Sequence, residues 1–212
     1  QSGFGRRGMS EQTKFDQVHE EYETAIRINP FDADAHFHYA HYLSNQNRLD
    51  EACRHYDSAL EIDPNNAETH HGFARVLTKQ GRTNEAREHY QIALNLDPNS
   101  ARAASNLARL SLIGGNVARG LDHALHALRI GTLPNNGVEI AGWFGKHAAK
   151  LEQIARNPDE STDRRGSALA LLITNDPENA PHYIDRCQTE TDFPSVGRVC
   201  SDILNLWTPQ DI

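Results

Sequence analysis

The twelve histidines are the residues of this sequence with the greatest capacity for chemistry. His38 and His41 lie three positions apart, as do His123 and His126, so each pair would share one face of a helix. Two imidazoles at this spacing can contribute to a zinc site. Five of the histidines recur at a spacing of thirty-four residues: His55, His89 and His123, and likewise His36 and His70. A repeated structural unit explains that recurrence, so a histidine-based metal carrier is only an alternative interpretation.

Nothing else in the sequence has the surroundings of a known catalytic group. There is no Gly-x-Ser-x-Gly motif, and the contexts of Cys53, Cys187 and Cys200 match no known cysteine nucleophile. The glycine-containing stretches at 4–8 and 111–116 lack the Lys-Ser/Thr ending of a phosphate-binding loop. We therefore expect neither an enzyme nor a bound cofactor or metal.

A nine-residue segment that contains a proline occurs three times and indicates how the chain is organised. It reads AIRINPFDA at 25–33, ALEIDPNNA at 59–67 and ALNLDPNSA at 93–101, a spacing of thirty-four residues. Apolar residues at helical spacing precede Pro64 and Pro98, which stop the helix. Asn66 and Ser100 are then expected to cap helices that open at residues 67 and 101. Such helix–turn–helix units bury their apolar faces by stacking on one another.

The repeated pattern resembles the tetratricopeptide repeat family, which has the same period and conserves Trp, Leu, Gly and Tyr in its first helix and Ala, Phe and Pro around its second. Residues 33–66 match it with Tyr39, Ala40, Leu43, Ala52, Tyr56, Ala59 and Pro64. Residues 67–100 match it with Phe73, Ala74, Leu77, Ala86, Tyr90, Ala93 and Pro98. Residues 101–134 match more weakly, because Ser111 replaces the aromatic and the proline comes late, at Pro134. His36, His70 and Ala104 replace the family tryptophan, which we expect to loosen the packing of each first helix.

The resemblance implies an all-α fold, a right-handed α-solenoid of stacked antiparallel helix pairs, with divergent C-terminal helical hairpins. We expect residues 1–8 to be a scar of expression cloning and 9–32 to be an N-terminal half repeat. Three repeats follow over 33–134, with bounds 33–66, 67–100 and 101–134. Residues 135–212 read as divergent helical hairpins that continue or cap the solenoid, with a separate small helical domain as the alternative. No apolar run is long enough to predict a membrane span.

In this family the first helices of successive repeats line a concave groove that binds peptides. The resemblance therefore implies a binding groove built from one stripe per first helix: Phe37, His41 and Asn45, then His71, Arg75 and Lys79, then Ser105 and Arg109, with Ile113 beyond. This set contains three cations and no acid, in a chain of formal net charge −8. The local reversal of sign favours an acidic or carboxylate-bearing peptide. The alternative is that these are ordinary solvated cations.

The two groove arginines suggest how such a peptide would be held. Arg75 and Arg109 occupy the same repeat position, so stacking should bring them to adjacent helices about 10 Å apart. A carboxylate could lie between them, with Lys79 close by. Chaperone-binding relatives place lysine and asparagine at certain groove positions, where this chain has Phe37, His41 and Ser105. That particular ligand is therefore not expected.

Two classes of function remain after this reading. The leading one is a non-enzymatic adaptor or assembly factor that binds a segment of a partner protein. The other is an accessory or regulatory subunit or domain of a larger enzyme, or of a secretion or assembly complex. Net acidity argues against nucleic-acid binding. Three cysteines, few and odd in number, favour a reducing compartment such as the cytoplasm, with a periplasmic or secreted chain as the alternative.

Two segments lead to further expectations about packing. Residues 13–29 form a second helix without its own first helix, so Phe15, Val18 and Tyr22 would leave part of an apolar face open. Exposed apolar patches tend to find a partner. We expect either self-association through this edge or coverage by residues 1–12, including Phe4. Near the C-terminus, Cys187 and Cys200 could approach each other if their segments form a helical hairpin.

Overall fold

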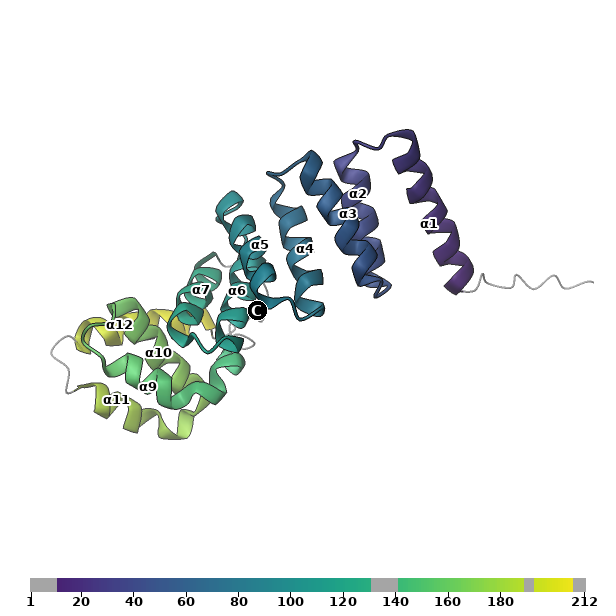
Figure 1. Cartoon of the computed structure of the whole chain (residues 1–212). Coiled ribbons are helices and arrows are strands. Elements are labelled where there is room, and N and C mark those ends of the chain that lie inside the picture. The colour runs from purple at the N-terminus through teal and green to yellow at the C-terminus, as the bar shows by residue number, and fades with distance from the viewer. Residues whose placement is uncertain (1–10, 131–140, 189–192, 208–212) are drawn as a thin grey trace, which may run out of the picture. The chain divides into compact units, whose positions relative to one another are not determined.

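The computed structural model describes residues 11–130, 141–188 and 193–207. Over these ranges the chain is helical with short turns, and no strand occurs in them. The chain forms two compact units, Gln1–Ile92 and Ala93–Ile212, each with its own set of packed helices (Figure 1). We call them unit 1 and unit 2 and describe each by itself. None of the helices within the described ranges is both long and apolar enough to cross a bilayer.

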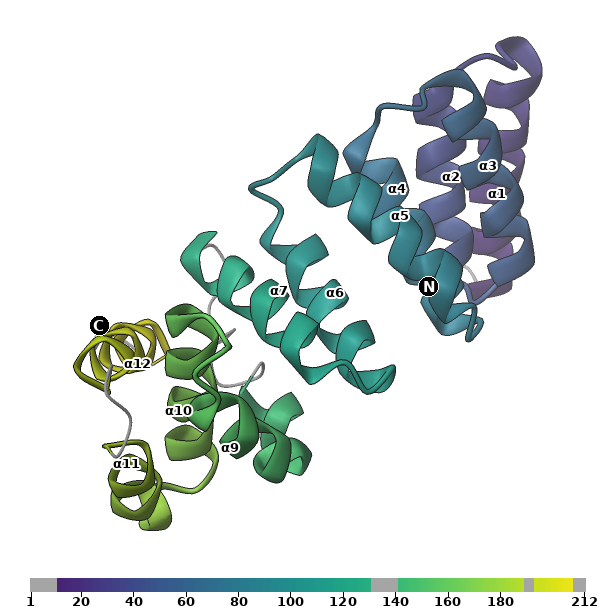
Figure 2. The same ribbon diagram turned by 60° about the vertical axis from the view of Figure 1, so that its left-hand side comes forward.

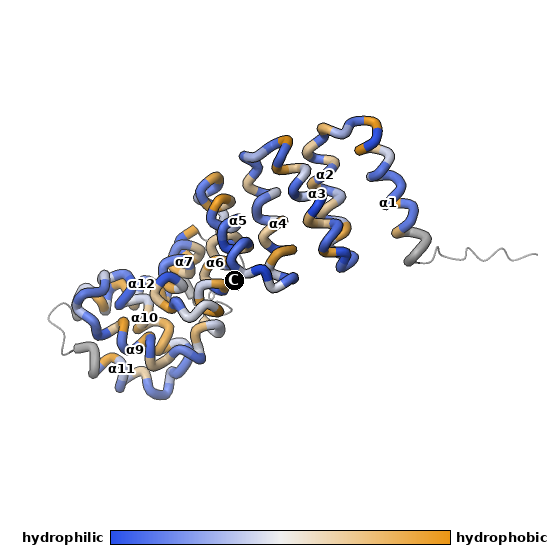
Figure 3. The backbone as a smooth tube through the Cα atoms, viewed as in Figure 1, coloured by the Kyte–Doolittle hydropathy of each residue, from blue (hydrophilic) through white to orange (hydrophobic). Residues whose placement is uncertain are grey.

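Unit 1 is a row of antiparallel helices joined by tight turns (Figure 2). Its helices are α1 (Glu11–Ile28), α2 (Ala33–Asn45), α3 (Leu49–Ile62), α4 (Ala67–Lys79) and most of α5 (Thr83–Leu96). Helix α2 packs against α1 and α3, and α3 also packs against α4. Along the backbone, hydrophobic residues interrupt the polar stretches at intervals rather than filling whole helices (Figure 3). This alternation is expected for amphipathic helices that bury one apolar face against their neighbours.

The first helix of each pair is started by a side-chain cap at a repeated position. The carboxylate of Asp32 accepts a hydrogen bond from the Ala35 amide at 2.9 Å. The side chains of Asn66 and Ser100 do the same for Thr69 and Ala103, at 2.9 and 3.4 Å. These caps satisfy amides that would otherwise lack a partner at the start of a helix. The predicted caps at Asn66 and Ser100, and the predicted helix starts at residues 67 and 101, are confirmed.

The turn inside each pair needs a left-handed residue, and the sequence supplies one each time. Asn47, Gly81 and Gly115 have φ of 61°, 77° and 76°. The amide that follows each of them reaches back to the helix it has just left: Arg48 to Leu43, Arg82 to Leu77 and Asn116 to Ser111, at 2.9, 2.9 and 2.8 Å. This is the hydrogen bond of a Schellman motif. Asparagine tolerates this backbone region better than other non-glycine residues.

Tyrosines at the predicted packing centres fill the interior of unit 1. Tyr56 is 1% exposed, and its ring lies 5.9 Å from that of Phe73 and 6.1 Å from that of Phe37. Gly72 on α4 faces this ring so closely that an added Cβ would lie 2.7 Å from the Tyr56 hydroxyl. The absence of a side chain at Gly72 therefore lets α4 approach α3.

Aromatic residues join α1 to α2, so the α1 face predicted to be open is largely packed. The ring of Phe15 stacks on Tyr42 at 5.7 Å, and that of Tyr22 stacks on Tyr39 at 5.1 Å. Phe15, Val18 and Tyr22 are all half-buried. The expected self-association through residues 13–29 stays a prediction. Its alternative, coverage by residues 1–12 with Phe4, falls mostly outside the described residues.

Unit 2 contains one regular helix pair followed by a less regular group. The pair is α6 (Ala101–Ile113) and α7 (Val117–Ile130). After it come η1 (Gly145–His147), α9 (Ala148–Arg156), α10 (Thr162–Asn175), η2 (Pro177–Asn179), α11 (Ala180–Gln188) and α12 (Phe193–Trp207). Helix α10 is central, since it packs against α7, α9, α11 and α12. Its residues 165–172 are all buried, which makes it the core of the divergent hairpins.

The two cysteines predicted to approach each other lie on α11 and α12. Cys200 is buried on α12. The side chain of Cys187 lies outside the described residues, as does that of Trp207. The approach of the two cysteines therefore stays a prediction.

Candidate binding face

The predicted groove residues of α2 lie along one stripe of that helix. Phe37 is half-buried, with its ring edge-on to that of Tyr56. His41 and Asn45 are exposed, one turn apart, with His41 Nδ1 3.4 Å from Asn45 Nδ2. The stripe therefore offers an apolar ring at one end and polar, accessible groups at the other.

Helices α2 and α4 are in contact, so the α4 stripe lies beside that of α2. Burial, followed by the positive charge of Arg75, lowers the pKa of His41 below its usual value. His71 is half-buried, with its ring 5.5 Å from that of Tyr90. Arg75 itself is half-buried, and makes no salt bridge or side-chain hydrogen bond within the part of the chain that the structure describes. Its guanidinium is thus available to a ligand.

Lys79, a predicted groove cation, makes a hydrogen bond within unit 1. Its Nζ donates a hydrogen bond to the backbone carbonyl oxygen of Ser44 at 3.1 Å and lies 3.5 Å from Ser44 Oγ. The last carbonyls of a helix lack partners within the helix and attract cations. Lys79 therefore caps the C-terminal end of α2 and links α4 to it, although its side chain is exposed.

An acid that the predicted stripes leave out lies close to them. Burial and Arg75 lower the pKa of His41, and the carboxylate of Glu68, in the first turn of α4, opposes them. Burial raises the pKa of Tyr56, and Glu68 adds to this while Arg75 opposes it. Glu68 precedes Arg75 by two helical turns, so both project from one side of α4. The face is therefore of mixed charge. The helical spacing alone could have revealed Glu68 if the stripe had been extended to the start of α4.

The two remaining predicted groove residues belong to unit 2. Ser105 on α6 is 8% exposed, so its side chain offers a ligand little surface. Arg109 is half-buried, while Ile113 is 65% exposed. The predicted approach of Arg75 to Arg109 joins residues of the two units and stays a prediction.

Behind this face, histidines at the family's tryptophan position form hydrogen-bonded pairs with the second helix. His36 Nδ1 lies 3.0 Å from His55 Nδ1, and His70 Nδ1 lies 2.9 Å from His89 Nδ1. His36 and His70 are each 7% exposed. The predicted loosening at these two positions is therefore wrong, because the histidines replace the aromatic contact with buried hydrogen bonds.

The histidine pairs have too few neighbours of the right kind for a metal site. Among the residues that the structure describes, no group of three or more His, Cys, Asp or Glu side chains converges in a way that could hold a metal ion. The Nδ1–Nδ1 distances are those of hydrogen bonds, and a metal at about 2 Å from each nitrogen would need them further apart.

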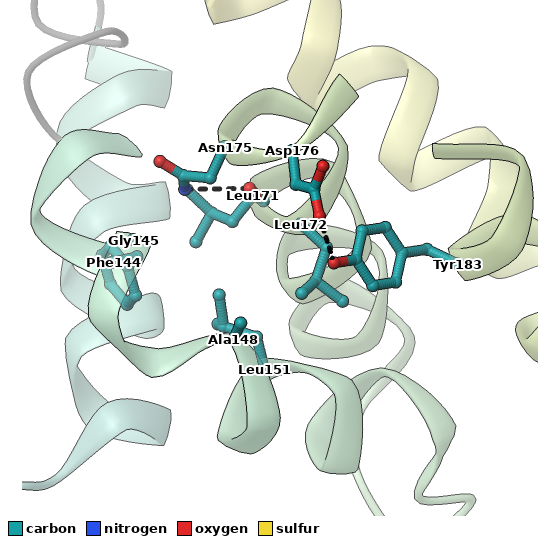
Figure 4. A pocket seen from close by; sticks show the side chains of 9 residues that line it. All are labelled: Phe144, Gly145, Ala148, Leu151, Leu171, Leu172, Asn175, Asp176 and Tyr183. Atoms are coloured by element: carbon teal, nitrogen blue, oxygen red, sulfur yellow. Dashed lines mark hydrogen bonds between the residues drawn. The ribbon is translucent and has the colours of Figure 1, made fainter. Parts of the chain in front are cut away.

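Unit 2 contains a small cavity of about 260 Å³ (Figure 4). Its lining residues are Phe144, Gly145, Ala148, Leu151, Leu171, Leu172, Asn175, Asp176 and Tyr183. Polar side chains of this lining make hydrogen bonds within unit 2: Tyr183 donates to Asp176 at 2.8 Å, and Asn175 donates to the carbonyls of Leu171 and Ala141 at 2.9 and 3.0 Å. These bonds support a structural role for the polar residues at the α10–α11 junction.

Sequence comparison identifies tetratricopeptide repeats in the part of the chain that builds this face. One tetratricopeptide repeat model matches residues 46–110 and a second matches residues 21–54. No curated protein sequence matches the chain significantly.

Solved structures share the fold of this chain, and one of them is described as a TPR protein. MamA has a TM-score of 0.61 at 13% identity, over 86% of this chain and 99% of its own. YrrB, described as a TPR protein with an unusual peptide-binding site, has a TM-score of 0.58 at 22% identity, over 87% and 92%. PilF of Pseudomonas aeruginosa has a TM-score of 0.57 at 20% identity, over 91% of each chain. With its repeated caps, turns and packing tyrosines, and with these family matches, the chain carries tetratricopeptide repeats over residues 21–110.

Proposed function

We propose that the chain is a non-catalytic scaffold for protein interactions, and that the α2–α4 face of unit 1 binds an acidic or carboxylate-bearing segment of a partner protein. Repeat folds of this kind present extended surfaces suited to recognition. The observation that carries the finer proposal is Arg75. It is a half-buried cation beside His41, with no ion pair or side-chain hydrogen bond to any described residue.

The surroundings of Arg75 indicate what kind of segment would fit. A carboxylate facing Arg75 would form a charge-assisted hydrogen bond, which is stronger than a neutral one. Phe37 offers an apolar contact on the neighbouring helix. Glu68 lies about 10 Å away along α4, by the rise of seven helical residues. It would repel a second acid, so a neutral or basic residue of the ligand is expected there.

A peptide titration by fluorescence anisotropy tests this proposal. Short labelled peptides of equal length would carry a free acidic C-terminus, the same sequence amidated, or glutamine in place of the acids. We expect the free acidic peptide to bind most tightly, and Arg75→Glu to weaken it by roughly tenfold or more, because hydrogen bonds to charged groups contribute about 1.5–3 kcal/mol. Affinity should fall as salt rises, since partly exposed charges are screened.

Arg87→Glu is the matched control, because Arg87 is a half-buried arginine on the second helix of the same repeat. It changes net charge by the same amount without altering the α2–α4 face. Equal binding of the acidic and glutamine peptides, or equal losses in the two variants, would contradict the proposal. Circular dichroism must show that both variants keep the helical content of the wild type.

A further inference from the structure

The hydrogen bonds of the paired histidines determine where their protons lie. His36 Nε2 lies 3.3 Å from the Pro30 carbonyl oxygen, and His70 Nε2 lies 3.0 Å from that of Pro64. A carbonyl oxygen can only accept, so both Nε2 atoms carry hydrogen. In neutral imidazoles the Nδ1 atoms of His36 and His70 are therefore acceptors, and the facing Nδ1 atoms of His55 and His89 must donate.

This arrangement admits one proton between the facing nitrogens and no more. If His36 gained a proton at Nδ1, two N–H groups would point at each other across 3.0 Å. The same conflict would arise at 2.9 Å between His70 and His89. Full protonation of either pair would also place two positive charges on rings whose centroids are 5.3 or 5.1 Å apart. The rings would have to separate, and they lie on helices α2 and α3, or α4 and α5.

A donor histidine would gain its proton at Nε2, away from the facing nitrogens, and burial opposes a positive charge there. Burial, then the neighbouring His36 and Arg54, lower the pKa of His55 to about 4, although Glu51 and Glu23 oppose them. Burial and then His70 lower the pKa of His89, with Glu85 opposing and Arg82 adding to the effect. An aromatic ring also packs against each donor histidine. The centroid of the Tyr39 ring lies 4.5 Å from that of His55, and the centroid of the Phe73 ring lies 4.6 Å from that of His89.

The next repeat lacks such a pair. Ala104 stands at the position of His36 and His70, and the carbonyl oxygen of Pro98 is instead 3.0 Å from Nε2 of His126 on α7. The described histidine pairs thus belong to the two repeats of unit 1 that carry the proposed binding face.

We propose that these two histidine pairs make the α2–α5 stack of unit 1 an acid-sensitive element, so that mild acidification loosens it and releases the ligand of its α2–α4 face. The second half of this inference rests on the proposed function; the first does not. Because the folded state keeps the donor histidines neutral while the unfolded chain protonates them at its ordinary value, the unfolded state binds more protons in acid. The stability that neutral His55 contributes is therefore retained above about pH 6.5 and is lost progressively as pH falls toward about 4, and the lowered pKa of His89 acts in the same direction.

Histidine NMR on the wild-type chain tests the pairing directly. At about pH 7.5, we expect His55 and His89 as Nδ1–H tautomers and His36 and His70 as Nε2–H tautomers. We also expect His55 and His89 to titrate below the exposed histidines. Nε2–H tautomers at His55 and His89, with ordinary titration, would overturn the proposal.

The double variant His55→Asn, His89→Asn tests the consequence. An asparagine amide can donate to the facing Nδ1, and its oxygen can accept once that ring is protonated, so the conflict disappears. Between about pH 7.5 and pH 5, the melting temperature of unit 1 should fall roughly 5–10 °C further in the wild type than in this variant, after allowance for solvent screening of the half-buried rings. The control His38→Asn, His182→Asn changes two exposed histidines and should behave like the wild type. An equal fall in melting temperature on acidification in the wild type and the His55/His89 variant would refute the proposal.

Ligand release is measured separately with the free acidic peptide described above. In acid, at a temperature between the two melting points, the wild type should lose the peptide and the His55/His89 variant should retain it. Peptide retention by both proteins would refute the release. If neither protein binds the peptide at neutral pH, the proposed function fails. The tautomers and the melting temperatures still test whether the histidine pairs make unit 1 sensitive to acid.

Discussion

Replacing Tyr56 by alanine should destabilise unit 1 by about 3–5 kcal/mol, as truncation of large buried aromatic residues does in protein cores. The ring is 1% exposed and lies against Phe37 on α2 and Phe73 on α4. It also faces Gly72 on α4, where an added Cβ would meet the Tyr56 ring. The cavity would thus open at the junction of three helices. Because helical repeats contact mainly their neighbours, the loss should be felt first in α2–α4.

Hydrogen exchange with residue resolution measures this effect. Protection should fall in α2, α3 and α4 while α10 and α12 keep theirs. Tyr56→Phe is the control, because it keeps the ring and removes only the hydroxyl, so it should cost less than about 1.5 kcal/mol. Simultaneous loss of protection throughout both units would show that the chain unfolds as one cooperative structure, contrary to this prediction.

Gly166→Ala should destabilise unit 2 strongly. A Cβ at Gly166 would lie 2.5 Å from Val199 Cγ1 and 2.6 Å from Val199 Cβ. The Cβ of Val199 is bound directly to the α12 backbone, so rotation of the side chain cannot relieve the contact. Helix α12 would have to move away from α10. We expect a loss of about 2–3 kcal/mol in urea denaturation, at the upper end of typical overpacking.

Gly142→Ala provides the matched comparison. Gly142 is exposed and helical, and a Cβ there would meet nothing within 4 Å. That substitution should raise stability by about 0.4–1 kcal/mol, because alanine has less conformational freedom to lose on folding. If Gly166→Ala proved as stable as Gly142→Ala, the close approach of α10 to α12 would be incorrect.

The repeat could be predicted from the sequence because its signals are local. Pro64, Pro98, Asn66 and Ser100 act through the backbone of their own turns, and each predicts a helix end or start without knowledge of the rest of the chain. The tyrosine at the packing centre, Tyr56, follows from the family pattern. The divergent helices of unit 2 have weaker local signals, so their exact bounds came only from the structure.

The chemistry of the binding face was harder to predict because it depends on contacts between helices. Lys79 reads as a free cation until the end of α2 is placed beside it, where Ser44 accepts its hydrogen bond. Ser105 fits the helical stripe but is buried. The histidine pairs recur at a separation of nineteen residues, His36 with His55 and His70 with His89, a spacing that has no meaning until the two helices are packed.

The most direct test of the central claim is an NMR titration of the isotope-labelled full chain with the acidic peptide. Side-chain resonances of Arg75, His41 and His71 should shift together and saturate. Intermolecular nuclear Overhauser effects should connect the peptide to the ring of Phe37. Arg87 on α5 and His182 on α11 should remain unchanged. Shifts that saturate instead on α3, α5 or unit 2, with Arg75 and His41 unaffected, would contradict the assignment of the binding site to the α2–α4 face.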